Sequence, residues 1–198
     1  MFLRRQCPEP SGGTQPPPAT PNEPALPDAL ARSYDLDHFF ELAQPVLTQA
    51  GQFSRPVTLL IITIDDLKAI KYGYGQQIGN QLLQAVMVYL GHNLRKSDIV
   101  ARYGGEEVIV LMPNTNKAQG WQGAERLHRV AAQRTFALAD SEKFLTISVG
   151  VAGWLATPTE VMPNLDTLIS QAKQALERAC QTGGNCTQTI PLPRALPT

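Results

Sequence analysis

Two glycines followed by two glutamates separate two apolar runs near the middle of this chain. The apolar runs are Ile99 to Tyr103 and Val108 to Met112, and the Gly-Gly-Glu-Glu segment occupies positions 104–107. Glycine adopts positive φ without a steric penalty, so a Gly-Gly pair between β-type runs predicts a tight antiparallel hairpin. Adjacent carboxylates can also hold a divalent cation, and glycines let a ligand approach the backbone closely. A solvated hairpin tip is the structural alternative.

Composition limits the classes of protein that fit. The 198 residues, 43% of them hydrophobic, suit one domain plus a tail. Seventeen basic and 17 acidic residues give no net charge, which argues against a non-specific nucleic-acid binder. No apolar run reaches the ~20 residues that a membrane helix needs. The three cysteines show no metal-binding spacing, which favours a reduced, cytoplasmic protein.

The pattern along the chain predicts one α/β domain. Prolines and glycines crowd residues 1–30, which we expect to be a disordered tail; the domain spans 31–192, and 193–198 form a flexible end. We expect helices covering a central mixed sheet of about five strands. Asn164 is positioned to cap the last helix, and Trp121, Leu127 and Val130 should face inward. The predicted helices are 34–49, 67–71, 79–94, 116–134 and 164–180, and the predicted strands are 56–63, 99–103, 108–112, 144–154 and 187–190.

Three segments resemble the GGDEF domain, the diguanylate cyclase family. They are the Gly-Gly-Glu-Glu turn, with Val108 in place of the usual Phe, the run Leu60 to Ile70, and the strand Ile147 to Ala152. The resemblance covers roughly residues 35–190. It implies a palm-like nucleotide cyclase fold in a bacterial signalling protein. The family joins two GTP molecules into cyclic di-GMP, and Mg²⁺ polarises the attacked phosphate.

The resemblance also implies that the metal site is altered. Active members place a metal-binding aspartate where this chain has Thr63, and a neutral hydroxyl is a much poorer Mg²⁺ ligand. Glu106 retains the second ligand position. Asp65 lies two residues beyond Thr63 on the same strand face, but its reach would be displaced by roughly 6–7 Å. Glu106 and Asp65 are therefore the candidate metal ligands of an impaired site, and helix capping is the structural alternative for Asp65 and Asp66.

The nucleotide-binding positions depart from the family as well. The family's guanine-recognition positions correspond to Lys71 and Asn80 in this chain. The Asn80 amide offers fewer acceptors for guanine than the aspartate that the family places there. The phosphate-binding lysine and arginine correspond to Cys180 and Gly184. A solvated surface lysine and a small buried residue are the structural alternatives for Lys71 and Cys180. The retained active-site positions are Ile64, Lys68, Gly104, Gly105, Glu106 and Glu107.

A second, regulatory site matches the family pattern. Arg95 and Asp98 stand at the spacing of the family's Arg-x-x-Asp product-inhibition site, and Arg126 matches a further arginine on the next helix. An arginine fork can bind phosphate and the guanine O6/N7 edge, while an aspartate accepts from guanine N1–H and N2–H. The structural alternative is vestigial inheritance, with Arg95 as a cation at a helix C-terminus.

Three hypotheses follow for function. The first is a degenerate, catalytically impaired domain that binds cyclic di-GMP through Arg95, Asp98 and Arg126 and regulates a partner. The second is an active or weak cyclase that uses Glu106, Asp65 and Lys68. The third is an interaction scaffold that binds no nucleotide. We expect no certain cofactor, with Mg²⁺ only if GTP is bound, and either a protein partner or a homodimer through the family's surface.

Overall fold

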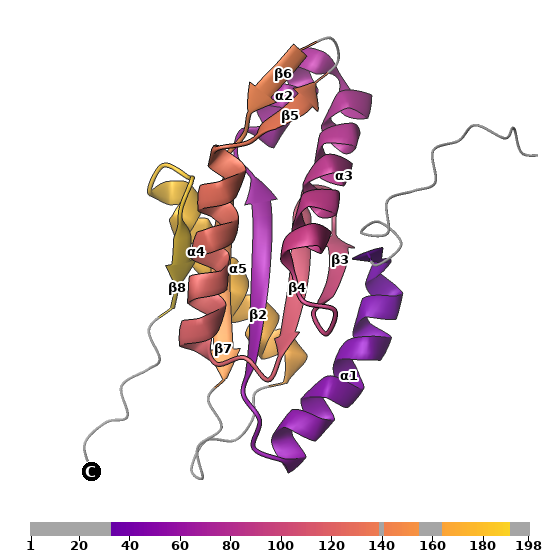
Figure 1. Cartoon of the computed structure of the whole chain (residues 1–198), viewed down its shortest axis with the longest axis vertical. Helices are drawn as coiled ribbons and strands as arrows, with labels where there is room; N and C mark the ends of the chain where they lie inside the picture. Colours follow the sequence, from indigo (N-terminus) through magenta and orange to yellow (C-terminus); the bar gives the residue numbers. More distant parts are fainter. Residues whose placement is uncertain (1–32, 139–140, 155–163, 191–198) are drawn as a thin grey trace, which may run out of the picture.

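The computed structural model describes residues 33–138, 141–154 and 164–190, so the predicted tails at 1–30 and 193–198 lie outside the described residues. A six-stranded sheet lies between helices, and a separate two-stranded hairpin stands at one end (Figure 1). The sheet strands are β1 (Ser33–Tyr34), β2 (Val57–Ile64), β3 (Ile99–Tyr103), β4 (Glu107–Pro113), β7 (Ile147–Trp154) and β8 (Thr187–Thr189). The hairpin strands are β5 (Thr135–Leu138) and β6 (Ser141–Phe144). The helices are α1 (Leu36–Gln52), α2 (Leu67–Tyr74), α3 (Gln76–Asn93), α4 (Lys117–Ala132) and α5 (Leu165–Gln181).

The sheet is mixed, as the sequence predicts. Its strand order is β1-β3-β4-β2-β7-β8, and the two outer pairs, β1 with β3 and β7 with β8, are parallel. The inner pairs are antiparallel, and β2 lies between β4 and β7. The end of β2 therefore lies beside the Gly-Gly-Glu-Glu turn on one side and the start of β7 on the other.

Both faces of β2 are buried, as its continuous apolar run predicts. Leu60, Ile62 and Ile64 point into a core formed with α3 and α4. Val57, Leu59 and Ile61 point into a second core formed with α1 and α5. The domain is thus a three-layer arrangement with two helices against each face of the sheet (Figure 1).

The last helix confirms the sequence analysis in detail. Asn164 is its N-cap, and its side-chain oxygen accepts from the Thr167 backbone N–H at 2.8 Å. The apolar stripe of α5 is buried, and the helix packs closely on β7 at Gly150. A Cβ at position 150 would lie 2.0 Å from the Ala172 carbonyl oxygen, so a glycine is required there.

Other expectations were wrong. Val130 is 39% exposed, because α4 packs through the smaller residues Gly120, Ala124 and Ala131 together with Leu127. Phe144 ends β6, is 68% exposed and does not begin β7. The β5–β6 hairpin was not predicted. Among the helices that the structure describes, none combines the length and apolarity needed to cross a membrane.

Candidate functional site

The Gly-Gly-Glu-Glu segment forms the predicted hairpin turn. Tyr103 pairs with Glu107, which leaves positions 104–106 as the turn, and Gly104 adopts a φ of 68° that favours glycine. Side chains of this chain hold all three turn carbonyls. Arg102 donates to Gly104 O at 3.3 Å and to Gly105 O at 2.9 Å, and the Thr63 hydroxyl donates to Glu106 O at 3.4 Å.

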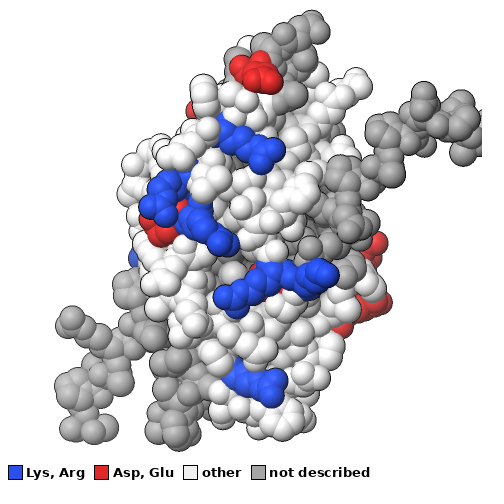
Figure 2. Space-filling view, viewed as in Figure 1, with Lys and Arg blue, Asp and Glu red and all other residues white. Residues whose placement is uncertain are grey.

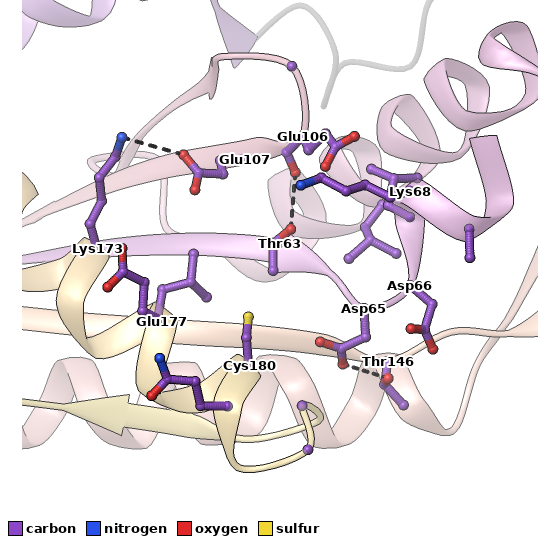
Figure 3. Close-up of a pocket in the computed structure, with 18 residues that line it drawn as sticks. Thr63, Asp65, Asp66, Lys68, Glu106, Glu107, Thr146, Lys173, Glu177 and Cys180 are labelled. Atoms are coloured by element: carbon purple, nitrogen blue, oxygen red, sulfur yellow. Dashed lines mark hydrogen bonds and ion pairs between the residues drawn. The ribbon is translucent and has the colours of Figure 1, made fainter. Parts of the chain in front are cut away.

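A cavity of about 1090 Å³ opens beside this turn (Figure 3). The end of β2, the start of α2, the turn, the second half of α5 and the glycines that follow it form its walls. Its lining carries five carboxylates and two lysines: Asp65, Asp66, Glu106, Glu107, Glu177, Lys68 and Lys173. This excess of negative charge disfavours a triphosphate unless cations compensate for it.

Both acids of the turn are paired with lysines. Lys71 Nζ lies 3.1 Å from Glu106 Oε1 and 3.3 Å from Gly105 O, and its side chain is only 10% exposed. Lys173 Nζ lies 3.8 Å from Glu107 Oε2 (Figure 3). It also lies 4.6 Å from the centroid of the Tyr103 ring. The interpretation of Lys71 as a solvated surface lysine is therefore wrong.

Sequence reasoning missed Lys173 altogether. It lies on α5 seven positions before Cys180, and this spacing of about two helical turns places both residues on one face. That spacing was available from the sequence once Cys180 had been assigned to the cavity. The face of α5 that lines the cavity thus carries a cysteine at position 180, where the resemblance predicts a lysine, and a lysine at position 173.

Asp65 has a structural role. Its carboxylate accepts from the Thr146 hydroxyl at 2.6 Å, the Ser148 hydroxyl at 2.6 Å and the Asn185 backbone N–H at 2.8 Å. It thereby ties the end of β2 to β7 and to the loop after α5. The structural alternative of helix capping does not hold for Asp66, because this N-cap residue of α2 has a φ of 59° and its side chain makes no cap hydrogen bond.

These side chains do not fit a bound Mg²⁺. The Thr63 hydroxyl donates to a backbone carbonyl, Glu106 is paired with Lys71, and both Asp65 oxygens accept from protein donors. Within the described part of the chain, no group of three or more His, Cys, Asp or Glu side chains could hold a metal ion. The metal ligands proposed from the sequence, Glu106 and Asp65, therefore already have other partners.

The residues predicted to bind cyclic di-GMP, here called the clamp, are Arg95, Asp98 and Arg126. They lie near the C-terminal end of α3. Arg126, on α4, donates from Nη2 to the Asn93 carbonyl at 3.0 Å, two residues before Arg95. The Asp98 carboxylate accepts from the Arg95 backbone N–H at 2.9 Å, and Asp98 N–H donates to Arg95 O at 3.1 Å. Both arginine side chains are exposed, and Figure 2 shows several separate basic side chains spread over the face that carries α3 and α4.

Comparison with known proteins assigns the family. The family described as "Diguanylate cyclase, GGDEF domain" matches residues 25–186. The chain belongs to the GGDEF domain family. The response regulator PleD of Caulobacter vibrioides is 33% identical over 156 residues, which cover 76% of this chain and 34% of PleD. The chain thus spans about a third of the length of this curated relative.

Solved structures share the fold. The active GGEEF domain of a diguanylate cyclase from Vibrio cholerae matches with a TM-score of 0.72 at 18% identity, over 82% of this chain and 99% of that one. The GGDEF domain of DgcB from Caulobacter crescentus, solved in complex with c-di-GMP, matches with a TM-score of 0.70 at 21% identity, over 84% and 96%. The palm-like cyclase fold is confirmed for this GGDEF domain.

Two further positions that the sequence predicts to depart from the family pattern make defined contacts. Gly184 has a φ of 75°, and a Cβ there would lie 2.9 Å from the Asp65 carboxylate, so an arginine would displace Asp65. Asn80 accepts from Arg102 Nη2 at 3.2 Å and so contacts the side chain that holds the turn. Lys68 and the buried Ile64 line the cavity of this GGDEF domain, as expected.

Cys180 differs from the expectation of a small buried residue. Its side chain is exposed at the cavity, and both Cys180 and Cys186 are free thiols (Figure 3). Partial burial, followed by the nearby Asp65, Cys186 and Glu107, raises the pKa of the Cys180 thiol. A cysteine side chain carries no positive charge in either protonation state, so it cannot replace a lysine as a phosphate-binding cation.

Proposed function

We propose that this GGDEF domain binds cyclic di-GMP through Arg95, Asp98 and Arg126, does not synthesise it efficiently, and transmits the binding to a protein partner. The hydrogen bond from Arg126 to the Asn93 carbonyl carries the proposal, because it places Arg126 next to the Arg95–Asp98 turn. Arg95 and Arg126 are both exposed, and guanidinium groups bind the phosphates and guanine edges of a dinucleotide well.

The cavity supports the absence of efficient turnover. Phosphoryl transfer of this kind depends on positioned cations at the reacting phosphate. Here Thr63 offers a hydroxyl already donated to Glu106 O, and Lys71 neutralises the remaining ligand, Glu106. Cys180 and Gly184 bring no positive charge to the phosphate positions. The second candidate, a weak cyclase, rests on the retained Gly104-Gly105-Glu106-Glu107 turn at the cavity.

The family comparison is consistent with a binding role. The DgcB domain with a similar fold was solved in complex with c-di-GMP. In the present chain, Asp98 is 7% exposed and organises the backbone at Arg95 through its carboxylate, so the turn that presents Arg95 is formed before any ligand arrives. A preformed clamp avoids much of the ordering cost of binding.

Isothermal titration calorimetry with cyclic di-GMP and with GTP tests the proposal. The wild-type domain should bind cyclic di-GMP, and Arg95→Ala should weaken binding by about tenfold or more, as expected for a lost charge-assisted contact. Lys96→Ala is the matched control, because it removes an adjacent exposed cation outside the clamp. Binding of neither nucleotide would favour the scaffold. Formation of cyclic di-GMP from GTP with Mg²⁺ or Mn²⁺ at ordinary enzyme rates would refute the loss of turnover.

A further inference from the structure

We propose that the Lys71 ammonium group is a built-in replacement for a divalent cation at Glu106. Lys71 Nζ contacts the carboxylate at 3.1 Å and the Gly105 carbonyl at 3.3 Å, so it binds two oxygens of the turn at once. Carboxylate and carbonyl oxygens are the groups that a hard cation uses in proteins. The inference builds on the proposed loss of turnover, but it concerns a different site from the cyclic di-GMP clamp.

The position of Lys71 is fixed by packing between α2 and α3. Its stem lies over Gly79 of α3: a Cβ at position 79 would lie 2.3 Å from Lys71 Cγ, 3.2 Å from Cδ and 3.0 Å from Cε. The charged end thus emerges from a groove that only glycine leaves open. Since the Lys71 side chain is 10% exposed, its ammonium group depends on Glu106 and the carbonyl for much of its compensation.

The rest of the turn is satisfied by the protein in the same way. Thr63 donates to Glu106 O, Arg102 donates to Gly104 O and Gly105 O, and Lys173 lies beside Glu107. The turn therefore needs no metal to neutralise or order it. A divalent cation that approached Glu106 would have to displace a bound ammonium group, so the two compete for one carboxylate.

This competition makes a specific prediction about restoring the metal site. Thr63→Asp returns a carboxylate to the end of β2 but leaves Lys71 on Glu106. The combined variant Thr63→Asp/Lys71→Met also frees Glu106, while the methionine retains most of the apolar stem. We expect the combined variant to bind Mn²⁺ about tenfold more tightly than Thr63→Asp alone, or better, which corresponds to about 1.4 kcal/mol of competition.

Electron paramagnetic resonance of free Mn²⁺ measures this binding directly and needs no activity. Gly79→Ala supplies a second variant that keeps the lysine charge but moves its stem, and alanine is favourable inside a helix. Combined with Thr63→Asp, it should also raise Mn²⁺ affinity. Gly73→Ala in the same background is the control, because a Cβ at position 73 meets nothing within 4 Å.

Equal Mn²⁺ affinity in Thr63→Asp and in both combined variants would overturn the proposal. If Lys71→Met fails to fold by circular dichroism, the Gly79→Ala pair decides the question alone. Cyclic di-GMP binding should be unchanged in all of these variants. If the combined variants bind Mn²⁺ no more tightly than Thr63→Asp but still bind cyclic di-GMP, this inference is refuted and the proposed clamp is not.

Discussion

Asp65→Ala tests whether this aspartate is a structural acceptor or a metal ligand. The substitution removes the acceptor for three donors: the Thr146 and Ser148 hydroxyls and the Asn185 backbone N–H. Ser148 is fully buried, and a buried donor left without a partner costs about 1–3 kcal/mol. Thr146 and Asn185 are partly accessible and can turn to water, so each should lose about 1 kcal/mol.

The expected loss in the free energy of unfolding is therefore about 3–5 kcal/mol, a large part of the 5–15 kcal/mol typical of a domain. Urea unfolding followed by tryptophan fluorescence measures it, since Trp154 is buried on β7. With a denaturant slope of about 2 kcal/mol per molar, the midpoint should fall by about 1.5–2.5 M. The experiment should be run without divalent cations.

The neighbouring Asp66→Asn is the matched control. Asp66 makes no side-chain cap hydrogen bond, and asparagine tolerates its positive φ, so the midpoint should hardly move. If Asp65→Ala leaves the metal-free midpoint unchanged, the three hydrogen bonds contribute nothing to stability. If the wild type is more stable than Asp65→Ala only in the presence of Mg²⁺, Asp65 acts as a metal ligand.

Two further predictions concern packing and pH. Gly150→Ala should destabilise the domain by about 1–3 kcal/mol in urea unfolding, because its Cβ would overlap the α5 backbone. Gly105→Ala is the control and should be close to neutral, because a Cβ there meets nothing within 4 Å. Equal effects of the two substitutions would contradict the close packing of α5 on β7. Because the pKa of Cys180 is raised, its alkylation by iodoacetamide at pH 8 should be slower than that of a free cysteine and should accelerate with pH through a midpoint above the usual thiol value. Asp65→Ala removes one cause of the raised pKa and should speed the reaction in peptide mapping, and a slower reaction would contradict that assignment.

The fold was predictable where the pattern of one segment determines its structure. The helix predicted at 164–180, its Asn164 cap and the strand predicted at 56–63 all follow from local sequence pattern and were confirmed. The prediction that Val130 faces inward was wrong, because α4 contacts the sheet through small residues, which a search for large apolar side chains overlooks. The β5–β6 hairpin carries too weak an alternation to be recognised alone.

The site was predictable in its location and less so in its contacts. The family resemblance predicts that Thr63, Lys71, Asn80, Cys180 and Gly184 depart from the family pattern. It could not reveal that Lys71 pairs with Glu106, because that contact joins residues 35 positions apart and depends on the open groove over Gly79. The like-charge repulsion expected between Glu106 and Glu107 is relieved by a different lysine for each, which only the packed structure reveals.

The central position of β2 has a consequence for how the chain folds during synthesis. Both of its hydrogen-bonding partners, β4 and β7, follow it in sequence, and Val57 pairs with Trp154. On the ribosome, β2 therefore emerges as an apolar strand with two open edges. One edge can pair once β4 is made, but the other stays open until β7 is made. A fragment that ends before Ile147 should aggregate rather than fold, and chaperone capture of nascent chains should peak while β2 waits for its second neighbour.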